Sequence, residues 1–443
     1  MISTLSVELL QEIRGKLAKS DQKSLRAACM EIGLAVNPLF FSSLILTTRD
    51  LRQEANMHIL TALASGETGW SPYAKTLTLR PTNDSYRPII VEARDAWSNL
   101  PDSAMQELLT SALRSMMNLR TVIWQLRDGR AWQWNAICDV LSTFSRLDGF
   151  HFRTDATAGR ALPRLEHLRT LEIELPDYGE DIPLADQITQ LVAETRALTS
   201  LQLFVPDKCQ SDVWTMLREG PGRGIHLKGI RTQYITPEFL AYLESYSGIE
   251  ILEVLCPDLD AKYANSEEEP EPDPALVDRF FHSVLRHHAA SLVELHFRSA
   301  YEGRCCFGPQ IVDSLSALHQ LTYLMISINT ADIAPPMDAM NLLLRTAVDL
   351  PGIRYLRIYT ARFPGGRGFH SGCGTGAASY ANQAREAILL AVYNFRSISP
   401  SSAVVCVESR HAYDLEFELK LISEGAGSGR FWTYQQIIPR AKN

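Results

Sequence analysis

The chain lacks the features by which most metalloenzymes and membrane proteins are first identified. Its 443 residues contain no Cys-x-x-Cys pair, and the eight cysteines are scattered without a histidine at zinc spacing, so we expect neither a metal nor a cofactor. Several cysteines stand in apolar runs, which predicts reduced thiols in an intracellular protein, cytoplasmic or nuclear. No apolar run approaches the roughly 20 residues that a bilayer requires, and no signal peptide is visible.

Positive charge is also scarce. Lysine and arginine number 43 against 51 aspartates and glutamates, which gives a net charge of −8 at pH 7. A protein that binds nucleic acid through its phosphates needs a basic surface. We therefore expect no nucleic-acid partner, and no membrane partner either. The apolar fraction of 46% is large enough for a sizeable buried core.

Motifs for catalysis are few, and the best of them is better explained as a flexible Gly-rich loop between repeats. Within the Gly-rich segment 363–376, Gly372-x-Gly374-x-x-Ala377 fits the dinucleotide-binding pattern. However, the preceding strand is expected to end near Tyr359, too far upstream, and no acidic residue follows at the required distance. We expect no catalytic residue, no metal ligand and no enzyme activity. An enzyme that uses the Gly-rich loop is the least favoured alternative.

The body of the chain repeats one strand signal. A leucine or isoleucine is followed three and five residues later by apolar residues, with a weaker copy at 227. The starts are 119, 147, 168, 198, 227, 249, 292, 321 and 353. Most intervals lie near the period of leucine-rich repeats, with helical segments between the strands. Each such unit leaves an apolar face that only its neighbours can cover. We therefore predict a mixed α/β fold, an irregular leucine-rich-repeat solenoid (horseshoe) over residues 47–399.

Other features support or interrupt this repeat. Leucine-rich repeats place an asparagine after the strand to satisfy the turning backbone, and at that offset stand Pro176, Pro206, Pro257 and Asn329. Residues 258–274 are acidic and proline-rich, which predicts a disordered insertion. Residues 360–380 are expected to form a Gly-rich loop. Strands are expected at 403–408, 413–421 and from 431, so we assign 400–443 to a C-terminal β cap.

The first 46 residues carry a helical pattern. One helix face is expected to bear four apolar side chains: Leu9, Leu10, Ile13 and Leu17. Ser6 can cap this helix, residues 19–21 are expected to break it, and a second helix from Ser24 should end before Pro38. A helical unit this short is marginally stable alone. It must therefore pack against the rest of the chain, a partner, or both.

The sequence Leu5-x-Val7-Glu8-Leu9-Leu10-x-x-Ile13-x-x-x-Leu17, with residues 24–29 and Pro38-Leu39-Phe40, resembles an F-box. With the repeats, the chain is similar to the F-box/leucine-rich-repeat substrate receptors of Skp–cullin–F-box ubiquitin ligases, most closely to fungal F-box families. This resemblance implies that residues 1–46 bind a Skp-type adaptor of a cullin ligase, and that the repeats bind a protein substrate for ubiquitin-dependent degradation. The expected adaptor-binding residues are Leu5, Val7, Leu9, Leu10, Ile13, Leu17 and Leu25.

The substrate-binding residues are expected between the apolar positions of the strands, since these face the concave side of a repeat. They are Arg80, His151, Arg153, Glu172, Glu174, Phe204, Glu253, His296, Arg298, Met325, Arg357 and Tyr359. The pattern predicts an acidic centre with basic ends, interleaved with apolar and aromatic side chains. Arginine and aromatic residues are common anchors of protein interfaces.

An alternative is an interaction scaffold that needs no adaptor and carries a degenerate F-box. Ser6, Gln22-Lys23 and Met30 differ from the residues usual in the family, which is consistent with this hypothesis. In such a scaffold Leu9, Ile13 and Leu17 would pack inward, and a charge introduced there would unfold the protein.

Overall fold

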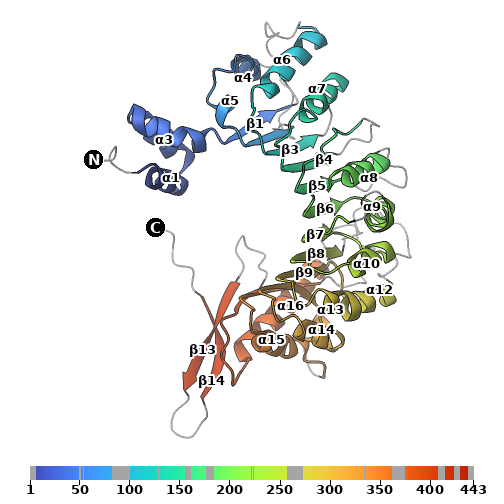
Figure 1. Cartoon of the computed structure of the whole chain (residues 1–443). Coiled ribbons are helices and arrows are strands. Elements are labelled where there is room, and N and C mark those ends of the chain that lie inside the picture. The colour runs from blue at the N-terminus through green and yellow to red at the C-terminus, as the bar shows by residue number, and fades with distance from the viewer. Residues whose placement is uncertain are drawn as a thin grey trace. The chain divides into compact units, whose positions relative to one another are not determined.

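The fold is a mixed α/β structure in which strands and helices alternate (Figure 1). The chain divides into two compact units, Met1–Thr199 with Glu219–Ile225 and Ser200–Arg218 with His226–Asn443. The computed structural model describes residues 6–48, 51–52, 54–81, 100–126, 130–154, 161–175, 184–220, 222, 224–256, 273–333, 336–361, 375–407, 415–423 and 430–437.

The first unit begins with three helices, α1 (Val7–Lys16), α2 (Lys19–Ala27) and α3 (Met30–Phe40). Ser6 caps α1 as predicted, because its Oγ accepts the backbone N–H of Leu9 at 3.4 Å. The expected break at 19–21 is wrong: these residues begin α2, where Asp21 suits the first turn. The expected stop before Pro38 is also wrong, since α3 includes Pro38 in its last turn. Packing of the buried Val36 outweighs the local preference there.

Parallel strands follow in the first unit, each paired with the next in the sequence. They are β1 (Ser43–Thr47), β2 (Thr76–Arg80), β3 (Thr121–Leu126), β4 (Gly149–Thr154) and β5 (Thr170–Glu174). Strand β1 was not predicted and lies at the end of the segment assigned to the F-box. Its buried Leu44 and Leu46 alternate with Ile45, which is 43% exposed, as expected of a strand with one covered face.

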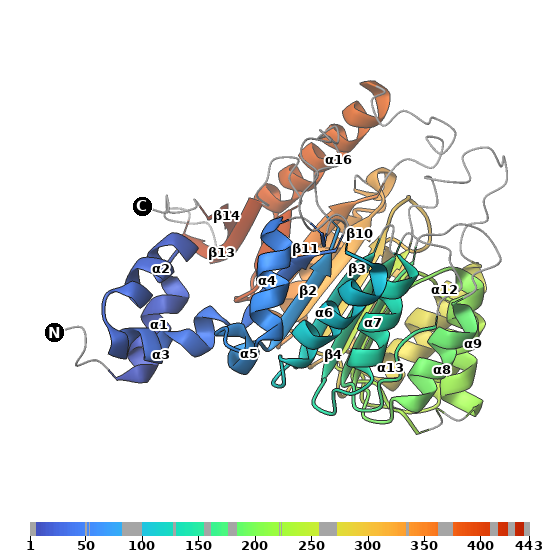
Figure 2. The same ribbon diagram turned by 90° about the horizontal axis from the view of Figure 1, so that it is seen from above.

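Helices cover one face of these strands (Figure 2). They are α4 (Glu54–Ala64), α5 (Trp70–Tyr73), α6 (Asp102–Arg114), α7 (Ala131–Leu141) and α8 (Ala185–Glu194). The covering is tight where aromatic rings meet. Trp134 of α7 lies 4.6 Å from Trp124 of β3 and 5.7 Å from Phe152 of β4, measured between ring centroids. These buried rings join a helix to two neighbouring strands.

The second unit continues the alternation. Its strands β6 to β12 pair in parallel in sequence order, and β13 and β14 add an antiparallel hairpin. The strands are β6 (Ser200–Phe204), β7 (Gly229–Thr232), β8 (Ile251–Cys256), β9 (Glu294–Ser299), β10 (Tyr323–Ile328), β11 (Tyr355–Thr360), β12 (Val404–Val407), β13 (Leu415–Ser423) and β14 (Arg430–Gln436). All nine predicted repeat strands are thus confirmed as β3 to β11, and the predicted C-terminal strands as β12 to β14.

The helices of the second unit are α9 (Asp207–Glu219), α10 (Pro237–Glu244), α12 (Pro274–Arg279), α13 (Leu285–His287), α14 (Val312–Ser316), α15 (Ala339–Asp349) and α16 (Thr375–Asn394). Short helical turns are η3 (Pro309–Ile311) and η4 (Thr330–Asp332). The helix predicted over 275–289 contains a π-helical turn, η2 (Phe280–Val284). This turn lets two consecutive residues, Phe280 and Phe281, both contact Phe297 of β9, at 5.0 and 4.8 Å between centroids.

Two predicted loops fall largely outside the described residues. Of the acidic insertion 258–274, only Asp273 and Pro274 are described, and they start α12: the Asp273 carboxylate accepts the N–H of Ala275 at 2.9 Å. Of the Gly-rich loop 360–380, residues 362–374 lie outside the description. The predicted bounds are wrong at both ends, since Thr360 belongs to β11 and residues 375–380 form the first turns of α16. Among the described helices, none is both long enough and apolar enough to cross a membrane.

Candidate functional site

The three N-terminal helices form a module with a core of its own. Leu10 of α1 is 4% exposed and packs with Ile32 and Val36 of α3, and around them lie the partly buried Leu25, Cys29, Ala35 and Phe40. Gln22 hydrogen-bonds the backbone at the C-terminal end of α1, where its Nε2 donates to the C=O of Leu17 at 2.9 Å. This hydrogen bond gives the polar Gln22 a structural role inside the module.

Apolar side chains also lie on the outside of this module. Leu9 and Ile13 of α1 are 49% and 41% exposed, and Met30 and Leu34 of α3 are 75% and 60% exposed. Within the part of the chain that the structure describes, five of the thirteen exposed large hydrophobic side chains belong to α1 and α3, the fifth being Val7. This concentration of exposed apolar side chains on one small module makes it a candidate interaction surface.

The structure does not expose all of the predicted adaptor-binding residues. Val7, Leu9 and Ile13 are exposed, whereas Leu10 is in the core and Leu25 packs against it; Leu17 is half-buried. Leu5 lies outside the described residues. Leu10 and Leu25 therefore hold the module together instead of lining its surface. Met30 and Leu34 were missed, although α3 carries apolar residues on two faces, at 32 and 36 as well as at 30 and 34.

The module is attached to the first strand through Phe41. Its ring lies 5.1 Å from that of Trp70, and the Arg26 guanidinium stands 4.6 Å from the ring centroid. Gly69 packs directly against the Phe41 ring: a Cβ on this residue would lie 2.3 Å from the ring. The Ser42 C=O then accepts the N–H of Thr76 at 2.9 Å, which brings β1 beside β2.

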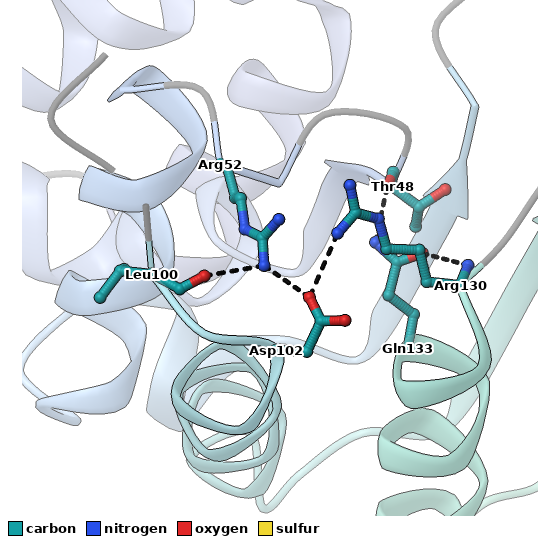
Figure 3. A network of polar contacts seen from close by, with 6 residues as sticks. All are labelled: Thr48, Arg52, Leu100, Asp102, Arg130 and Gln133. Atoms are coloured by element: carbon teal, nitrogen blue, oxygen red, sulfur yellow. Dashed lines mark hydrogen bonds and ion pairs between the residues drawn. The ribbon is translucent and has the colours of Figure 1, made fainter. Parts of the chain in front are cut away.

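A polar network joins the first strand–helix connections of this unit (Figure 3). An oxygen of Asp102, at the start of α6, contacts Arg52 at 2.5 Å and Arg130 at 3.1 Å. The buried Gln133 of α7 accepts the N–H of Arg130 at 3.1 Å and donates to the C=O of Thr48 at 3.2 Å. The carboxylate and amide already satisfy their cationic and backbone neighbours, so we assign this network a structural role.

On the strand face opposite the helices, the first unit pairs its charges between neighbouring strands. His151 of β4 lies 2.7 Å from Glu172 of β5, and Arg153 lies 3.2 Å from Glu174. Both pairs follow the register of the two strands. They are partly exposed, so each contributes at most about 1 kcal/mol. Arg80 of β2 is half-buried, at the end of that strand.

The second unit has a charged centre on the equivalent face. Arg231 of β7 contacts Glu253 of β8 at 2.5 Å, and His296 of β9 lies 3.5 Å from the same carboxylate. The second ring nitrogen of His296 is 3.6 Å from Glu294. Burial lowers the pKa of His296, with the Glu294 carboxylate acting in the opposite direction. The imidazole is therefore neutral at pH 7, and Glu253 is compensated by Arg231.

Aromatic side chains and arginines follow on β9, β10 and β11. His296 stacks on Tyr323 at 4.7 Å between centroids, and Tyr323 lies 6.2 Å from Tyr355. The guanidinium carbons of Arg298 and Arg357 stand 4.6 and 5.2 Å from the centroid of the Tyr359 ring. This part of the strand face thus combines arginine with exposed aromatic area, the composition of a protein-binding surface.

The predicted substrate-binding residues lie on the strands as expected, but the charge distribution differs from the expectation. The carboxylates of Glu172, Glu174 and Glu253 each have a basic partner on a neighbouring strand, so the centre is not an open acidic surface. Met325 and Tyr359 are 9% and 7% exposed, whereas Phe204 is half-buried. Cross-strand pairing could not be seen in the sequence, because it depends on which strands are neighbours.

No model of a known protein family matches this chain, and a search of curated proteins finds no match either. Over the described ranges, no group of three His, Cys, Asp or Glu side chains is placed to hold a metal ion. No disulfide joins the described cysteines, and burial raises the pKa of Cys138 to about 12.

Proposed function

We propose that this protein is the substrate-recognition subunit of a Skp–cullin–F-box type ubiquitin ligase. In this proposal α1 to α3 bind a Skp-type adaptor, the strand faces bind a protein substrate, and other subunits carry out the ligation chemistry. The observation that carries the proposal is the group of exposed apolar side chains on a helical module that already has its own core. Such side chains are not needed to fold the module, so a partner is the better reason for them.

The strand–helix units support the repeat part of the proposal. Strands β3 to β11 each arise from one copy of the same apolar pattern, and the apolar positions lie on the covered side: Leu252, Leu295 and Leu324 are 0% exposed. Asn329 occupies the position where leucine-rich repeats carry an asparagine. Its Oδ1 accepts the backbone N–H of Gly303 at 2.9 Å, which is the role the repeat requires.

The binding free energy that Leu9 and Ile13 of α1 could contribute follows from how exposed they are. Complete burial of a leucine or isoleucine side chain stabilises a complex by about 1.5–3 kcal/mol, and Leu9 and Ile13 are roughly half exposed. Covering what remains exposed would contribute on the order of 1 kcal/mol each. A charge at either position would in addition have to be desolvated in the interface, so it should weaken binding far more than truncation does.

The test is co-purification of the full chain with a Skp-type adaptor, comparing wild type with Leu9→Asp and Ile13→Asp. Because both side chains are exposed, the variants should fold normally but lose the adaptor. Met117→Asp is the matched control, since Met117 is 73% exposed and lies outside the module, between α6 and β3. This control should retain wild-type binding.

Two results would contradict the proposal: folded wild-type protein that binds no adaptor, or Leu9→Asp and Ile13→Asp proteins that bind it as well as wild type. The first result would favour the adaptor-independent scaffold. That alternative requires Leu9 and Ile13 to pack inward, and their exposure speaks against it. Circular dichroism of the variants separates the two, because a charge on an inward face would unfold the module.

A further inference from the structure

The face of β9 to β11 holds two arginines on one aromatic ring. Arg298 belongs to β9 and Tyr359 to β11, and β10 lies between these strands. The Arg298 side chain therefore crosses a strand to reach the Tyr359 ring, at 4.6 Å from its centroid. Arg357 approaches the same ring at 5.2 Å. A tyrosine ring attracts a cation through its quadrupole, so it can fix the direction of both side chains.

Ser327 of β10 makes this crossing possible. It is fully buried, and its Oγ accepts the N–H of Ser299 at 3.0 Å and donates to the C=O of Ser299 at 3.1 Å. The serine side chain is thus turned onto the backbone of β9 and leaves no bulk between Arg298 and Tyr359. A larger residue at this position would block the path of the arginine.

The charge of Arg298 is not neutralised within the described part of the protein. No carboxylate there lies within ion-pair distance of this exposed side chain. Glu253 is occupied by Arg231, and Glu294 lies four residues before Arg298 on the same strand, about 13 Å away at the rise of a β-strand. At physiological salt the Debye length is about 8 Å, so Glu294 does little to compensate Arg298.

From these contacts we propose that this face binds an acidic segment of a protein, with one anionic side chain held by Arg298 and Arg357. Guanidinium groups bind carboxylates and phosphates through paired, charge-assisted hydrogen bonds. The inference rests on the proposed function only in naming that protein as the ligase substrate. It adds to the proposed function the chemical class of the substrate, which is a protein with an acidic segment.

A peptide segment fits this face better than a small free anion. On the same strand face, at the level of Glu294 and four residues before Arg298, lie apolar and aromatic side chains that remain accessible: Tyr355 is 47% and Ile251 39% exposed, and Tyr323 is half-buried between His296 and Tyr355. A small anion would leave this area uncovered. The flanking residues of a peptide can cover it, and tyrosine and arginine are frequent anchors of such contacts.

The experiment measures binding of the purified full chain, without an adaptor, to four fluorescent peptide pools. The pools have degenerate flanks and one fixed central residue, which is serine, lysine, glutamate or phosphoserine. Wild type should bind the glutamate pool, the phosphoserine pool or both at least tenfold more tightly than the serine and lysine pools. If wild type prefers both the glutamate and the phosphoserine pools, a carboxylate is sufficient for binding. If it prefers the phosphoserine pool alone, the substrate must be phosphorylated.

Arg298→Gln and Arg357→Gln should each abolish that preference, and Arg298→Lys should restore part of it through its charge. The matched control is Arg304→Gln, which also removes one positive charge. Arg304 lies in the connection between β9 and η3, and its guanidinium is 2.9 Å from Asp278 of α12, so this variant should behave as wild type. Equal binding of all four pools, or an unchanged preference in a folded Arg298→Gln protein, would overturn the inference. A failure of adaptor binding would leave this result unaffected.

Discussion

Protonation of His288 should destabilise the second unit, because this histidine is completely buried. Its Nε2 lies 3.0 Å from the C=O of Leu243, and its Nδ1 lies 3.4 Å from the N–H of Ile249. A neutral imidazole with its proton on Nε2 satisfies both groups, whereas a protonated ring would face the N–H of Ile249 with a second donor. Burial lowers the pKa of His288 from 6.5 to about 4, against the opposing effect of the Leu243 hydrogen bond.

The direction in which stability changes with pH follows from proton uptake by the folded and unfolded states. Well above pH 6.5 the residue is neutral whether the protein is folded or unfolded, so the free energy of unfolding does not depend on it. Between pH 6.5 and about 4 only the unfolded chain takes up the proton, and stability falls as the pH is lowered. The loss attributable to His288 should be about 2 kcal/mol at pH 5 and about 3 kcal/mol at pH 4.

The assay is urea denaturation from pH 8 to pH 4.5, comparing wild type with His288→Gln. Glutamine can donate to the C=O of Leu243 but cannot be protonated. The variant should be less stable at pH 8, and its stability should decline less steeply than that of wild type below pH 6.5. Parallel pH profiles for the two proteins would refute the reasoning, because other titrating groups contribute equally to both.

Four further substitutions test packing in the first unit by thermal and urea denaturation. Gln133→Ala should cost about 2 kcal/mol, because it leaves a buried C=O at the end of β1 without its donor; unchanged stability would exclude that role. Gly69→Ala should cost about 1–3 kcal/mol by displacing the Phe41 ring, and wild-type stability would show that the ring moves freely. Leu10→Ala should cost about 2–5 kcal/mol and Leu9→Ala little, since only the former is buried; equal effects would contradict the packing described.

Much of the strand architecture could be predicted because its signal is local. A leucine or isoleucine at each start, followed by alternation of apolar and polar residues, specifies a strand with one covered face without reference to any other part of the chain. The nine strands β3 to β11 and the three C-terminal strands were found in this way. The errors arose where packing outweighs local preference, as at Pro38 in α3.

The candidate surfaces depended on tertiary structure to a greater degree. Leu9 and Leu10 are neighbours with the same chemistry, and the sequence placed both on one face. The structure exposes Leu9 and buries Leu10, because only Leu10 is directed toward Ile32 and Val36 of α3. The exposed Met30 and Leu34 on α3 were likewise missed. Whether an apolar residue is buried or exposed depends on its neighbours in the fold, which the sequence does not give.

The sequence by itself determined which residues alternate, where strands β3 to β14 lie, and that the strands carry charges on their open side. Tertiary structure decided which of those charges cancel. Glu253 is neutralised by Arg231 and Arg298 crosses to Tyr359, because parallel pairing brings together residues that are 22 and 61 positions apart in the chain. Alternation is a property of each strand alone, whereas an ion pair or a ring contact requires a particular neighbour in a particular register.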